Sequence, residues 1–262
     1  MAETGDKKIA MVTGAGSGLG KATAELLALE GKSIVAADVD GDSAKNVAEA
    51  LSRHTDTQAV TVDVSDSTDV ERLVETAVSR FGRIDILVHC AGIARGKTQK
   101  GESGWLPMEE VSDADWHQVL EINLSGTFFV NRAVGRVMIR HRWGRIINTA
   151  SISGIIANKG LAGLGPYSAS KGGIITLTKV LAVEWARYNI TVNCISPSYM
   201  ATEMGVRSQT IPGFKELQLE MTPMGRLGAP EEFARTVSFL ASEGSSYITG
   251  HNLLIDGGYT AW

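Results

Sequence analysis

The chain has 262 residues, of which 44% are hydrophobic and 21% are charged, and its formal net charge is −4. This composition is typical of a soluble globular protein. The acidic balance argues against nucleic-acid binding and against electrostatic attraction to an anionic membrane. The sequence contains neither an apolar signal segment nor a run of about 18 apolar residues that would span a bilayer. Its two cysteines provide no disulfide framework and no metal-binding spacing. We therefore expect a cytoplasmic protein without a metal.

Short apolar runs rich in β-branched residues alternate with helical patterns along the whole chain. Seven runs are expected as strands: 8–14, 33–39, 59–64, 84–92, 144–151, 190–197 and 252–258. Because they are almost continuously apolar, they suit a parallel sheet covered on both faces. Helical patterns lie between the early strands, for example at 21–31, 43–53 and 67–82. The alternation predicts right-handed crossovers and a doubly wound, Rossmann-type α/β fold with a seven-stranded parallel sheet and helices on both faces.

No repeat or linker divides residues 1–262, so we expect a single domain. Two long polar connections, about 94–113 and 198–228, show no regular period. Both follow the carboxyl ends of predicted strands, where open α/β sheets bind ligands. Long loops are usually functional or disordered. We expect these two segments to form the substrate side of the site.

The first strand runs into TGAGSGLG, at residues 13–20, in which four of eight residues are glycine. The spacing is not that of a Walker phosphate loop, because Ala22 follows Lys21, and it does not fit GxGxxG either. The remaining pattern, Gly14-x-x-x-Gly18-x-Gly20, lies at a strand-to-helix turn. Glycines there let the backbone approach a pyrophosphate at the helix N-terminus. A tight turn without a ligand needs fewer glycines, so the loop predicts a dinucleotide.

Asp38 ends the second predicted strand, 24 residues beyond Gly14. A carboxylate there accepts hydrogen bonds from an adenosine ribose and repels the 2′-phosphate of NADP. Neither Ser17 nor Val39 supplies a cation for such a phosphate. An isolated aspartate at a strand end is ordinarily a helix cap, but next to this glycine loop it favours NAD over NADP.

Tyr167 precedes Lys171 by four residues, directly after Pro166. Proline suits the first turn of a helix, and this spacing puts the tyrosine and the lysine on one helix face. Oxidising an alcohol requires a base for its hydroxyl proton while a hydride leaves the carbon. A phenol, with a pKa of about 10, needs about 4 kcal/mol of stabilisation to act near pH 7. An ammonium about 4 Å away, at an effective dielectric of about 20, supplies that much. The pair predicts a general acid/base tuned by a lysine.

Several short patterns occur along the chain in this order: TGAGSGLG, Asp38, VDV, EINLSG, INTASISG, YSASK and ISPSYMAT. With these patterns the chain resembles a short-chain dehydrogenase/reductase over almost its whole length. The resemblance implies a nicotinamide-dependent enzyme that interconverts a secondary alcohol and a ketone. It assigns the role of general acid/base to Tyr167. It implies that Lys171, besides tuning the tyrosine, binds the nicotinamide ribose. Ser151 then bonds the substrate oxygen, and Asn123 holds a water in the proton relay.

The resemblance also implies the contacts to the cofactor. They are Gly14, Ser17, Gly18, Leu19, Gly20, Asp38, Asp63, Val64, Cys90, Gly92, Tyr167, Lys171, Met200 and Thr202. In this set Asp63 and Val64 match the adenine edge, and Met200 and Thr202 match the nicotinamide carboxamide. Cys90 stands where the family has an asparagine, and we interpret it as a small buried residue rather than a nucleophile. Substrate contacts are expected from Ser151, Tyr167 and Tyr199.

The leading hypothesis is an NAD-dependent dehydrogenase of a small-molecule alcohol or ketone, such as a polyol, a sugar acid or a cyclic alcohol. One alternative is a 3-oxoacyl-[acyl-carrier-protein] reductase that uses NADPH, against which Asp38 counts. Another is a non-catalytic nucleotide-sensing protein on the same fold. Arg95, Lys97 and Lys100 either meet an anionic substrate or are solvated. The resemblance further implies a homotetramer built on the helical segments 113–141 and 165–189, with the C-terminal strand at a second interface.

Overall fold

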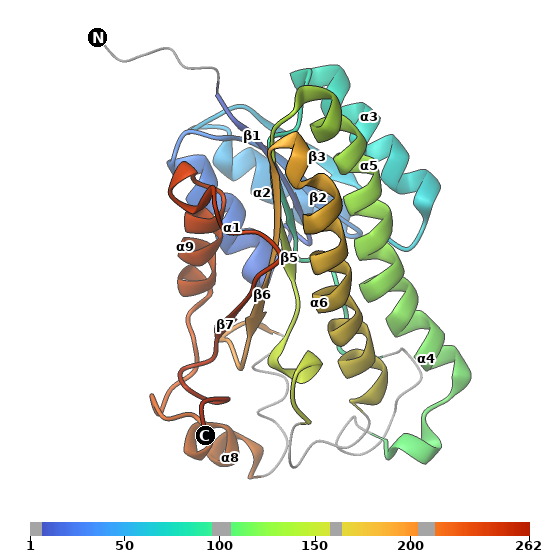
Figure 1. The fold of residues 1–262 in the computed structure, drawn as a ribbon, viewed down its shortest axis with the longest axis vertical. Coiled ribbons are helices and arrows are strands. Elements are labelled where there is room, and N and C mark those ends of the chain that lie inside the picture. Colours follow the sequence, from blue (N-terminus) through green and yellow to red (C-terminus); the bar gives the residue numbers. More distant parts are fainter. Residues whose placement is uncertain (1–6, 96–105, 158–163, 204–212) are drawn as a thin grey trace.

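Seven parallel strands lie side by side at the centre of the molecule (Figure 1). The structure is a computed structural model that describes residues 7–95, 106–157, 164–203 and 213–262. The strands are β1 (Ile9–Thr13), β2 (Ser33–Asp38), β3 (Thr57–Thr61), β4 (Ile86–His89), β5 (Gly144–Thr149), β6 (Ile190–Pro197) and β7 (Asn252–Ile255). They form one sheet in the order β3-β2-β1-β4-β5-β6-β7. The predicted doubly wound sheet is confirmed, and its order reverses direction between β1 and β4, where such sheets bind ligands.

Helices cover both faces of the sheet (Figure 1). On one face lie α1 (Gly18–Leu29), α2 (Gly41–Leu51) and α9 (Pro230–Leu240). On the other lie α3 (Ser67–Phe81), α4 (Asp113–Leu120), α5 (Gly126–His141) and α6 (Gly165–Trp185). The short helix α8 (Phe214–Glu220) lies beyond the carboxyl ends of the strands, near the C-terminus. No helix within the described ranges is long and apolar enough to cross a membrane.

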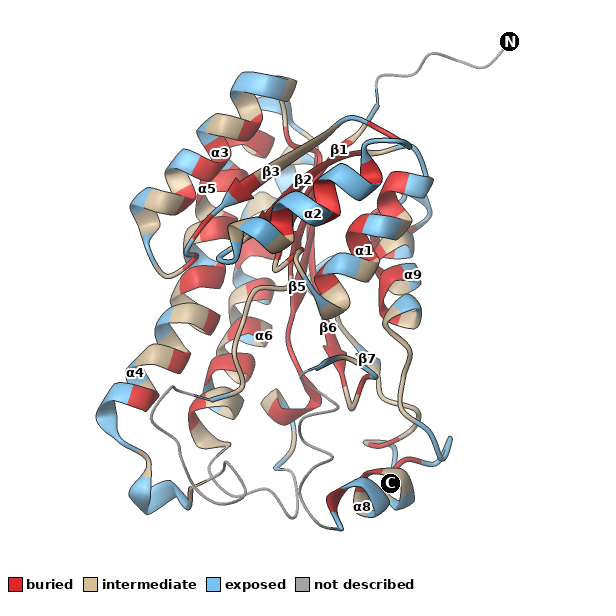
Figure 2. Cartoon of the chain, turned by 180° about the vertical axis from the view of Figure 1, so that it is seen from behind, coloured by how far each residue is buried: buried red, intermediate tan, exposed pale blue. Residues whose placement is uncertain are grey.

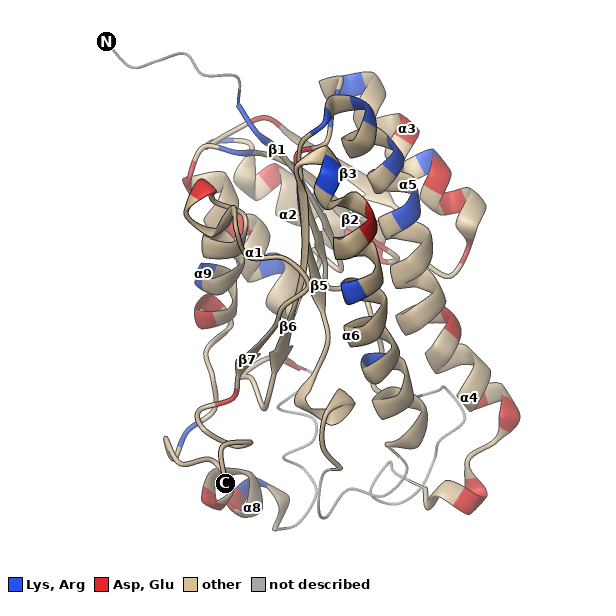
Figure 3. Cartoon of the chain, in the orientation of Figure 1, with Lys and Arg blue, Asp and Glu red and all other residues tan. Residues whose placement is uncertain are grey.

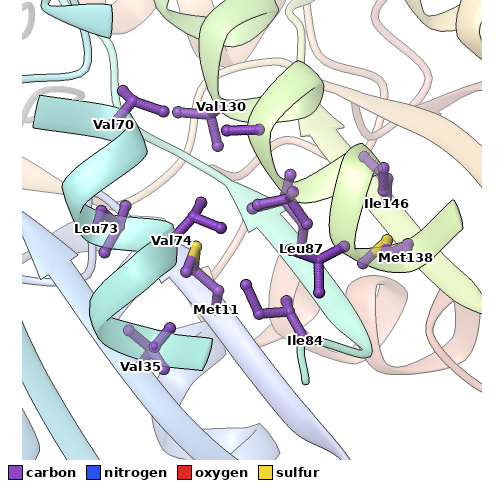
Figure 4. Close-up of a cluster of buried hydrophobic side chains, with 14 of the residues drawn as sticks. Met11, Val35, Val70, Leu73, Val74, Ile84, Leu87, Val130, Met138 and Ile146 are labelled. Carbon is purple, nitrogen blue, oxygen red and sulfur yellow. The ribbon is translucent and has the colours of Figure 1, made fainter. Parts of the chain in front are cut away.

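The inner strands β1, β2, β4, β5 and β6 are buried on both faces, and the edge strands β3 and β7 are only partly buried. The outer faces of the helices are exposed (Figure 2). Successive side chains of a strand point to opposite faces. Met11 and Leu87 therefore join the core under α3 and α5 (Figure 4), while Val12 and Val88 join the core under α1 and α9. Two apolar cores, one on each face, explain why the strands read as almost continuous hydrophobic runs.

Helix α3 begins and ends at the residues that its sequence indicates. The side chain of Asp66 accepts a hydrogen bond from the backbone N–H of Thr68 at 2.8 Å, and Gly82 ends the helix in the left-handed conformation, at φ 77°. Acidic residues lie in the first turns of α3, α4 and α9, and basic residues in the last turns of α3 and α5 (Figure 3). These charges complement the helix dipoles, so they have a structural role.

Two expectations about the segments that follow the strands need correction. Residues 198–228 are not irregular throughout, because residues 214–220 form α8. This helix has only two turns, too few for a helical period to be recognised in the sequence, and it buries Phe214 and Gln218. In the segment 94–113, residues 108–110 form a short 3₁₀ helix and residues 96–105 lie outside the described ranges. The third strand also ends earlier than expected, at Thr61, so Val62 and Val64 lie beyond it.

Helices α5 and α6 approach each other closely through a glycine. A Cβ atom built on Gly135 would lie 2.5 Å from Cη2 of the Trp185 ring, well inside van der Waals contact. The ring in turn packs against the core under α3, α5 and α6. Helix α5 follows the turn that carries Asn123, and α6 carries Lys171. The separation of these two helices thus depends on the absence of a side chain at Gly135.

We expect Gly135→Ala to lower the free energy of unfolding by about 1–3 kcal/mol, because overpacking outweighs the better helix propensity of alanine. In a Trp185→Leu background the same substitution should instead stabilise the protein by up to about 1 kcal/mol, since only the propensity term remains. Urea unfolding of the four variants of this cycle measures both effects. The same sign in both backgrounds would contradict the packing explanation.

Candidate active site

A cavity of about 720 Å³ opens at the carboxyl ends of the strands. The loops after β1 to β6 and the first turns of α6 contribute its walls. Every residue that the sequence predicted for the cofactor or the substrate lines this cavity: Gly14, Ser17, Gly18, Leu19, Gly20, Asp38, Asp63, Val64, Cys90, Gly92, Ser151, Tyr167, Lys171, Tyr199, Met200 and Thr202. Asn123 is 1% exposed and lies behind the wall. Arg95 also lines the cavity, whereas Lys97 and Lys100 lie outside the described residues.

The glycine loop is too tight for side chains at several positions. A Cβ on Gly20 would lie 2.0 Å from the carbonyl oxygen of Gly14, and one on Gly14 would lie 2.8 Å from the backbone N of Ala91. Gly14 and Gly18 have φ values of 68° and 51°, which L side chains rarely adopt. Ser17 precedes α1 without capping it by its side chain. The loop thus brings bare backbone and the positive end of a helix dipole to the cavity.

Asp38 closes one end of the cavity and holds the glycine loop at the same time. Its Oδ2 accepts a hydrogen bond from the N–H of Gly16 at 2.9 Å, and its Oδ1 accepts one from Asp40 N–H at 3.1 Å. A helix cap, the alternative for an aspartate here, is provided instead by Asp40 at the start of α2. Asp38 therefore keeps acceptor capacity on a carboxylate that faces the cavity.

Ser151, Tyr167 and Lys171 meet at the other end of the cavity. Ser151 follows β5, and the other two lie one turn apart at the start of α6. The side chain of Ser151 interacts with the Tyr167 hydroxyl and lowers its pKa, and both residues line the cavity. The Lys171 ammonium donates to the carbonyl oxygen of Thr149 at 2.7 Å and lies 5.5 Å from the centre of the Tyr167 ring. The arrangement combines a phenol, a hydroxyl partner and an ammonium in one wall.

Asn123 lies in a π-helical turn, Glu121–Ser125, between α4 and α5. Its Oδ1 accepts from the N–H of Ile93 at 2.8 Å, and its Nδ2 donates to the carbonyl oxygen of Ile93 at 2.8 Å and to Ser170 Oγ at 3.0 Å. A π-turn is often found at functional sites. Asn123 thus fixes the loop after β4 against α6, next to Lys171.

Burial changes the acidity of several groups in this wall. It raises the pKa of Tyr167 above that of a free phenol, and the interaction with Ser151 offsets part of the rise. Burial lowers the pKa of Lys171 to about 8. The protein's own groups thus shift the Tyr167 pKa in the direction opposite to that expected from the Tyr–Lys spacing, because desolvation is the dominant cause.

Two neighbours of Lys171 are kept uncharged. Cys90 is partly buried rather than fully buried as expected, and burial raises the pKa of its thiol to about 11, which argues against a nucleophilic thiolate. Burial also lowers the pKa of His89 to about 3, and the positive charge of Lys171 adds to this effect. Among the described residues, no group of three or more His, Cys, Asp or Glu side chains is placed to hold a metal ion.

Some groups that line the cavity could not be predicted from the sequence. The acceptor for Lys171 is the backbone carbonyl of Thr149, and a backbone group gives no clue through residue type. Gln118 and Glu121 line the cavity from the end of α4. Their spacing of three residues places them on one helix face, but only the packing of α4 against α6 shows that this face borders the site.

Comparison with known proteins agrees with this geometry. A family model described as Enoyl-(Acyl carrier protein) reductase matches residues 14–260. The NAD-dependent glycerol dehydrogenase of Listeria innocua is 41% identical over 254 residues, which cover 97% of this chain and 94% of that protein. The 3-oxoacyl-[acyl-carrier-protein] reductase FabG of Thermotoga maritima is 39% identical over 255 residues, with 96% and 97% covered. The crystal structure of gox2181 has a TM-score of 0.92 at 35% identity and covers 98% of this chain and 97% of that one.

Relatives that match nearly the full length are named dehydrogenases and reductases, and the glycine loop and the serine, tyrosine and lysine lie around one cavity. The chain therefore belongs to the short-chain dehydrogenase/reductase family, whose members are nicotinamide-dependent oxidoreductases acting on CH–OH groups.

Proposed function

We propose that this protein is an NAD-dependent dehydrogenase that interconverts a secondary alcohol and a ketone. The observation that carries the proposal is one cavity with Asp38 at one end and Ser151, Tyr167 and Lys171 at the other. Asp38 would hold the adenosine ribose of a dinucleotide bound in this cavity, and Tyr167 and Lys171 would lie on the side of its nicotinamide.

The walls fit such a cofactor along its length. The bare glycine loop at the N-terminus of α1 suits the pyrophosphate, because no side chain obstructs the approach to the helix. Asp63 and Val64, beyond β3, would hold the adenine. Gly92 and Cys90 would contact the adjoining ribose of the dinucleotide through their backbone. Met200 and Thr202, after β6, would hold the carboxamide of the nicotinamide, and Tyr167 and Lys171 its ribose.

In the oxidation that we propose, the substrate hydroxyl lies between Ser151 and Tyr167. The O–H bond breaks and its proton passes to the oxygen of an ionised Tyr167, while the C–H bond of the same carbon breaks and the C=O bond forms. The hydride that leaves this carbon would pass to the oxidised nicotinamide, which would also supply a positive charge when bound. Ser151 orients the oxygen, and Lys171 stabilises the phenolate.

Electrostatic energies indicate that Lys171 alone does not stabilise the Tyr167 phenolate enough, so that the positive charge of the oxidised nicotinamide is also needed. At 5.5 Å from the ring centre, and with an effective dielectric of about 20, an ammonium stabilises a phenolate by about 3 kcal/mol. Bringing a free phenol from a pKa of about 10 to about 7 takes about 4 kcal/mol, and burial adds to this requirement. We infer that the phenolate forms only when the ammonium and the oxidised nicotinamide act together.

A polyol is the substrate class that we favour. A relative over nearly the whole chain is named a glycerol dehydrogenase. Polar side chains surround the substrate end of the cavity, at Gln118, Glu121, Ser153 and Tyr199.

We also expect the homotetramer implied by the family. Exposed apolar side chains support contacts between copies, at Phe128 on α5, at Val180 and Val183 on α6 and at Leu254 on β7.

The alternative is a 3-oxoacyl-[acyl-carrier-protein] reductase, which the relative from Thermotoga maritima and the description of the family model favour. This alternative requires a thioester substrate in the same cavity, and we expect it to use NADPH. Asp38 argues against it, because its carboxylate would face the 2′-phosphate.

Tyr167→Phe should lower kcat with NAD and a polyol by at least about a hundredfold, since general acid/base catalysis is worth about 10²–10⁴. NAD affinity should fall by no more than about 12-fold, because at most one hydrogen bond to the nicotinamide ribose is lost and Lys171 remains. Tyr188→Phe, which removes a hydroxyl far from the cavity, is the matched control. Turnover followed by the absorbance of reduced nicotinamide, and NAD affinity measured by calorimetry, test this role. A variant that retains most of its kcat would refute it.

Asp38→Asn should shift the ratio of kcat/KM for NAD over NADP by at least about tenfold towards NADP, because it removes a repulsion of about 1–4 kcal/mol. Asp40→Asn removes an equal charge two residues away, from a carboxylate that caps α2, and should leave the ratio within about twofold. A preference of the wild-type protein for NADP would overturn the assignment of Asp38 and support the acyl-carrier alternative.

The buried Lys171 should make stability depend on pH. Its pKa of about 8 in the folded protein lies below the value of about 10.4 in an unfolded chain. Between these values the unfolded state binds more protons, so stability rises with pH. Relative to Lys171→Met, the wild-type free energy of unfolding should therefore increase by about 2 kcal/mol from about pH 7.5 to about pH 9.5. Urea titrations of both proteins measure this difference in the free energy of unfolding. A difference that does not change with pH would contradict burial of Lys171 as its cause.

A further inference from the structure

A row of buried polar side chains, which we call the polar ladder, runs from Asn123 along α5 into the sheet. Its members are Thr127 and Asn131 on α5, Asn148 on β5 and Thr178 on α6, and each of them is 0% exposed. None of these four described residues lines the cavity. Burying a polar group costs free energy unless it is hydrogen-bonded. The hydrogen bonds of the ladder therefore show what it holds together.

The first step of the ladder bonds the backbone of Asn123. The Thr127 hydroxyl donates to the Asn123 carbonyl oxygen, and Asn131 Nδ2 donates in the same way to the Thr127 carbonyl oxygen at 2.8 Å. A threonine hydroxyl often bonds the carbonyl four residues earlier, as Thr236 bonds Glu232 at 3.0 Å on α9. At Thr127, however, the acceptor belongs to the π-turn, which is a rare form of backbone.

The second step is a reciprocal pair of side-chain amides. Asn131 Nδ2 donates to Asn148 Oδ1 at 2.8 Å, and Asn148 Nδ2 donates back to Asn131 Oδ1 at 3.2 Å. Asn148 Nδ2 also donates to the Thr178 hydroxyl oxygen at 3.2 Å. Together with the bond to the Thr127 carbonyl, these contacts use all four N–H donors of the two amides. A buried polar network that is fully satisfied makes the core around it rigid, so the pair fixes α5 against β5 and α6.

Both ends of the ladder adjoin the candidate site. Asn148 directly precedes Thr149, whose carbonyl oxygen accepts the hydrogen bond from the Lys171 ammonium at 2.7 Å. Asn123 and Lys171 approach each other at Gly92, because a Cβ built there would lie 3.0 Å from Asn123 Oδ1 and 3.7 Å from Lys171 Nζ. The ladder thus connects the π-turn with the strand end that holds the lysine, through side chains that stay outside the cavity.

We propose that Thr127 and Asn131 are positioning residues that hold the π-turn, and with it Asn123, in place beside Lys171. The proposal rests on the proposed function, because Asn123 is expected to hold a water in the proton relay of that reaction. When the ladder is broken, Asn123 shifts relative to Lys171 and proton transfer slows. Cofactor binding stays intact, because the ladder contributes no residue to the cavity wall.

Thr127→Val removes the hydroxyl and keeps the shape of the side chain. A methyl group cannot approach the Asn123 carbonyl oxygen as closely as a hydrogen-bonded hydroxyl does, so it displaces the π-turn. With NAD and an alcohol that the wild-type protein oxidises, kcat should fall by more than about twofold, since a displacement of about 1 Å costs up to about a hundredfold. NAD affinity, measured by calorimetry, should stay within about twofold. A kcat that stays within about twofold of the wild-type value overturns the proposal.

Two further variants separate positioning from a merely structural role. Thr127→Ser keeps the hydroxyl and should retain kcat within about twofold. Thr236→Val removes a bond of the same type on α9, a helix that contributes no residue to the cavity wall. It should sensitise the protein to urea as Thr127→Val does, but leave kcat within about twofold. Equal losses of kcat in the two valine variants overturn the proposal, because a general loosening of the fold would then explain both.

The amide pair is tested by replacing both partners together. The double variant Asn131→Leu, Asn148→Leu leaves no amide without its partner, and apolar side chains of similar size fill the core. It should bind NAD as the wild-type protein does but lose kcat by more than about twofold. If it does not fold, Asn131→Ser takes its place with the same expectation, because serine is too short to bond Asn148. Retention of kcat in the variant that folds overturns the role of Asn131.

A wild-type protein that oxidises no secondary alcohol with NAD or NADP would refute the proposed function. The positioning role is then decided by hydrogen exchange at the backbone N–H of Ile93, which bonds Asn123 Oδ1 at 2.8 Å. Exchange should be more than about twofold faster in Thr127→Val, because the displaced Asn123 protects this N–H less. It should be unchanged in Thr236→Val. An exchange rate that does not differ between the wild-type protein and Thr127→Val overturns the positioning role.

Discussion

One buried positive charge, the ammonium of Lys171, links the parts of the candidate site. The lysine is 5% exposed, and burial lowers its pKa to about 8. An ammonium is tolerated in such a place only when it finds hydrogen-bond partners. The last carbonyl of β5, at Thr149, provides one, so the start of α6 must lie over the end of that strand. Tyr167, one turn earlier, is thereby placed beside Ser151, and Asn123 fixes the neighbouring loop through Ile93 and Ser170.

The cavity is lined by different chemical groups along its length, which suits a ligand made of unlike parts. Carboxylates lie at Asp38, the last residue of β2, and at Asp63, beyond β3. The ammonium of Lys171 lies beyond β5, and the carboxylate of Glu121 lines the substrate end. The glycine loop exposes backbone and a helix N-terminus, which favour negative charge. The sheet produces this arrangement because the loops after β1 and β4 diverge where the strand order reverses. Later parts of the chain, α8 and the C-terminal turn at residues 256–260, pack behind the substrate wall through the contacts of Phe214 and Tyr259 with Tyr199.

Much of the fold and of the cofactor side was predictable from the sequence, because each part leaves a local signal. Strands buried on both faces give apolar runs, Gly82 ends α3, and close approaches at Gly14 and Gly20 require glycine. Other features have no such signal. The two turns of α8 are too short to show a period, and the acceptor at Thr149 is a backbone group. The contact of Tyr199 with Tyr259 joins residues 60 positions apart. The rise in the pKa of Tyr167 comes from burial, which the Tyr–Lys spacing does not reveal.

The central claim is that this cavity moves a hydride from the carbon of a secondary alcohol to NAD, with Tyr167 as the base. The most direct measurement uses a polyol deuterated at its secondary carbon, incubated with the wild-type protein and NAD, followed by mass spectrometry of the cofactor. The account predicts reduced nicotinamide that carries one deuterium per molecule, together with one equivalent of ketone. Reduced nicotinamide without deuterium, or binding of NAD with no reduction by any secondary alcohol, would contradict it.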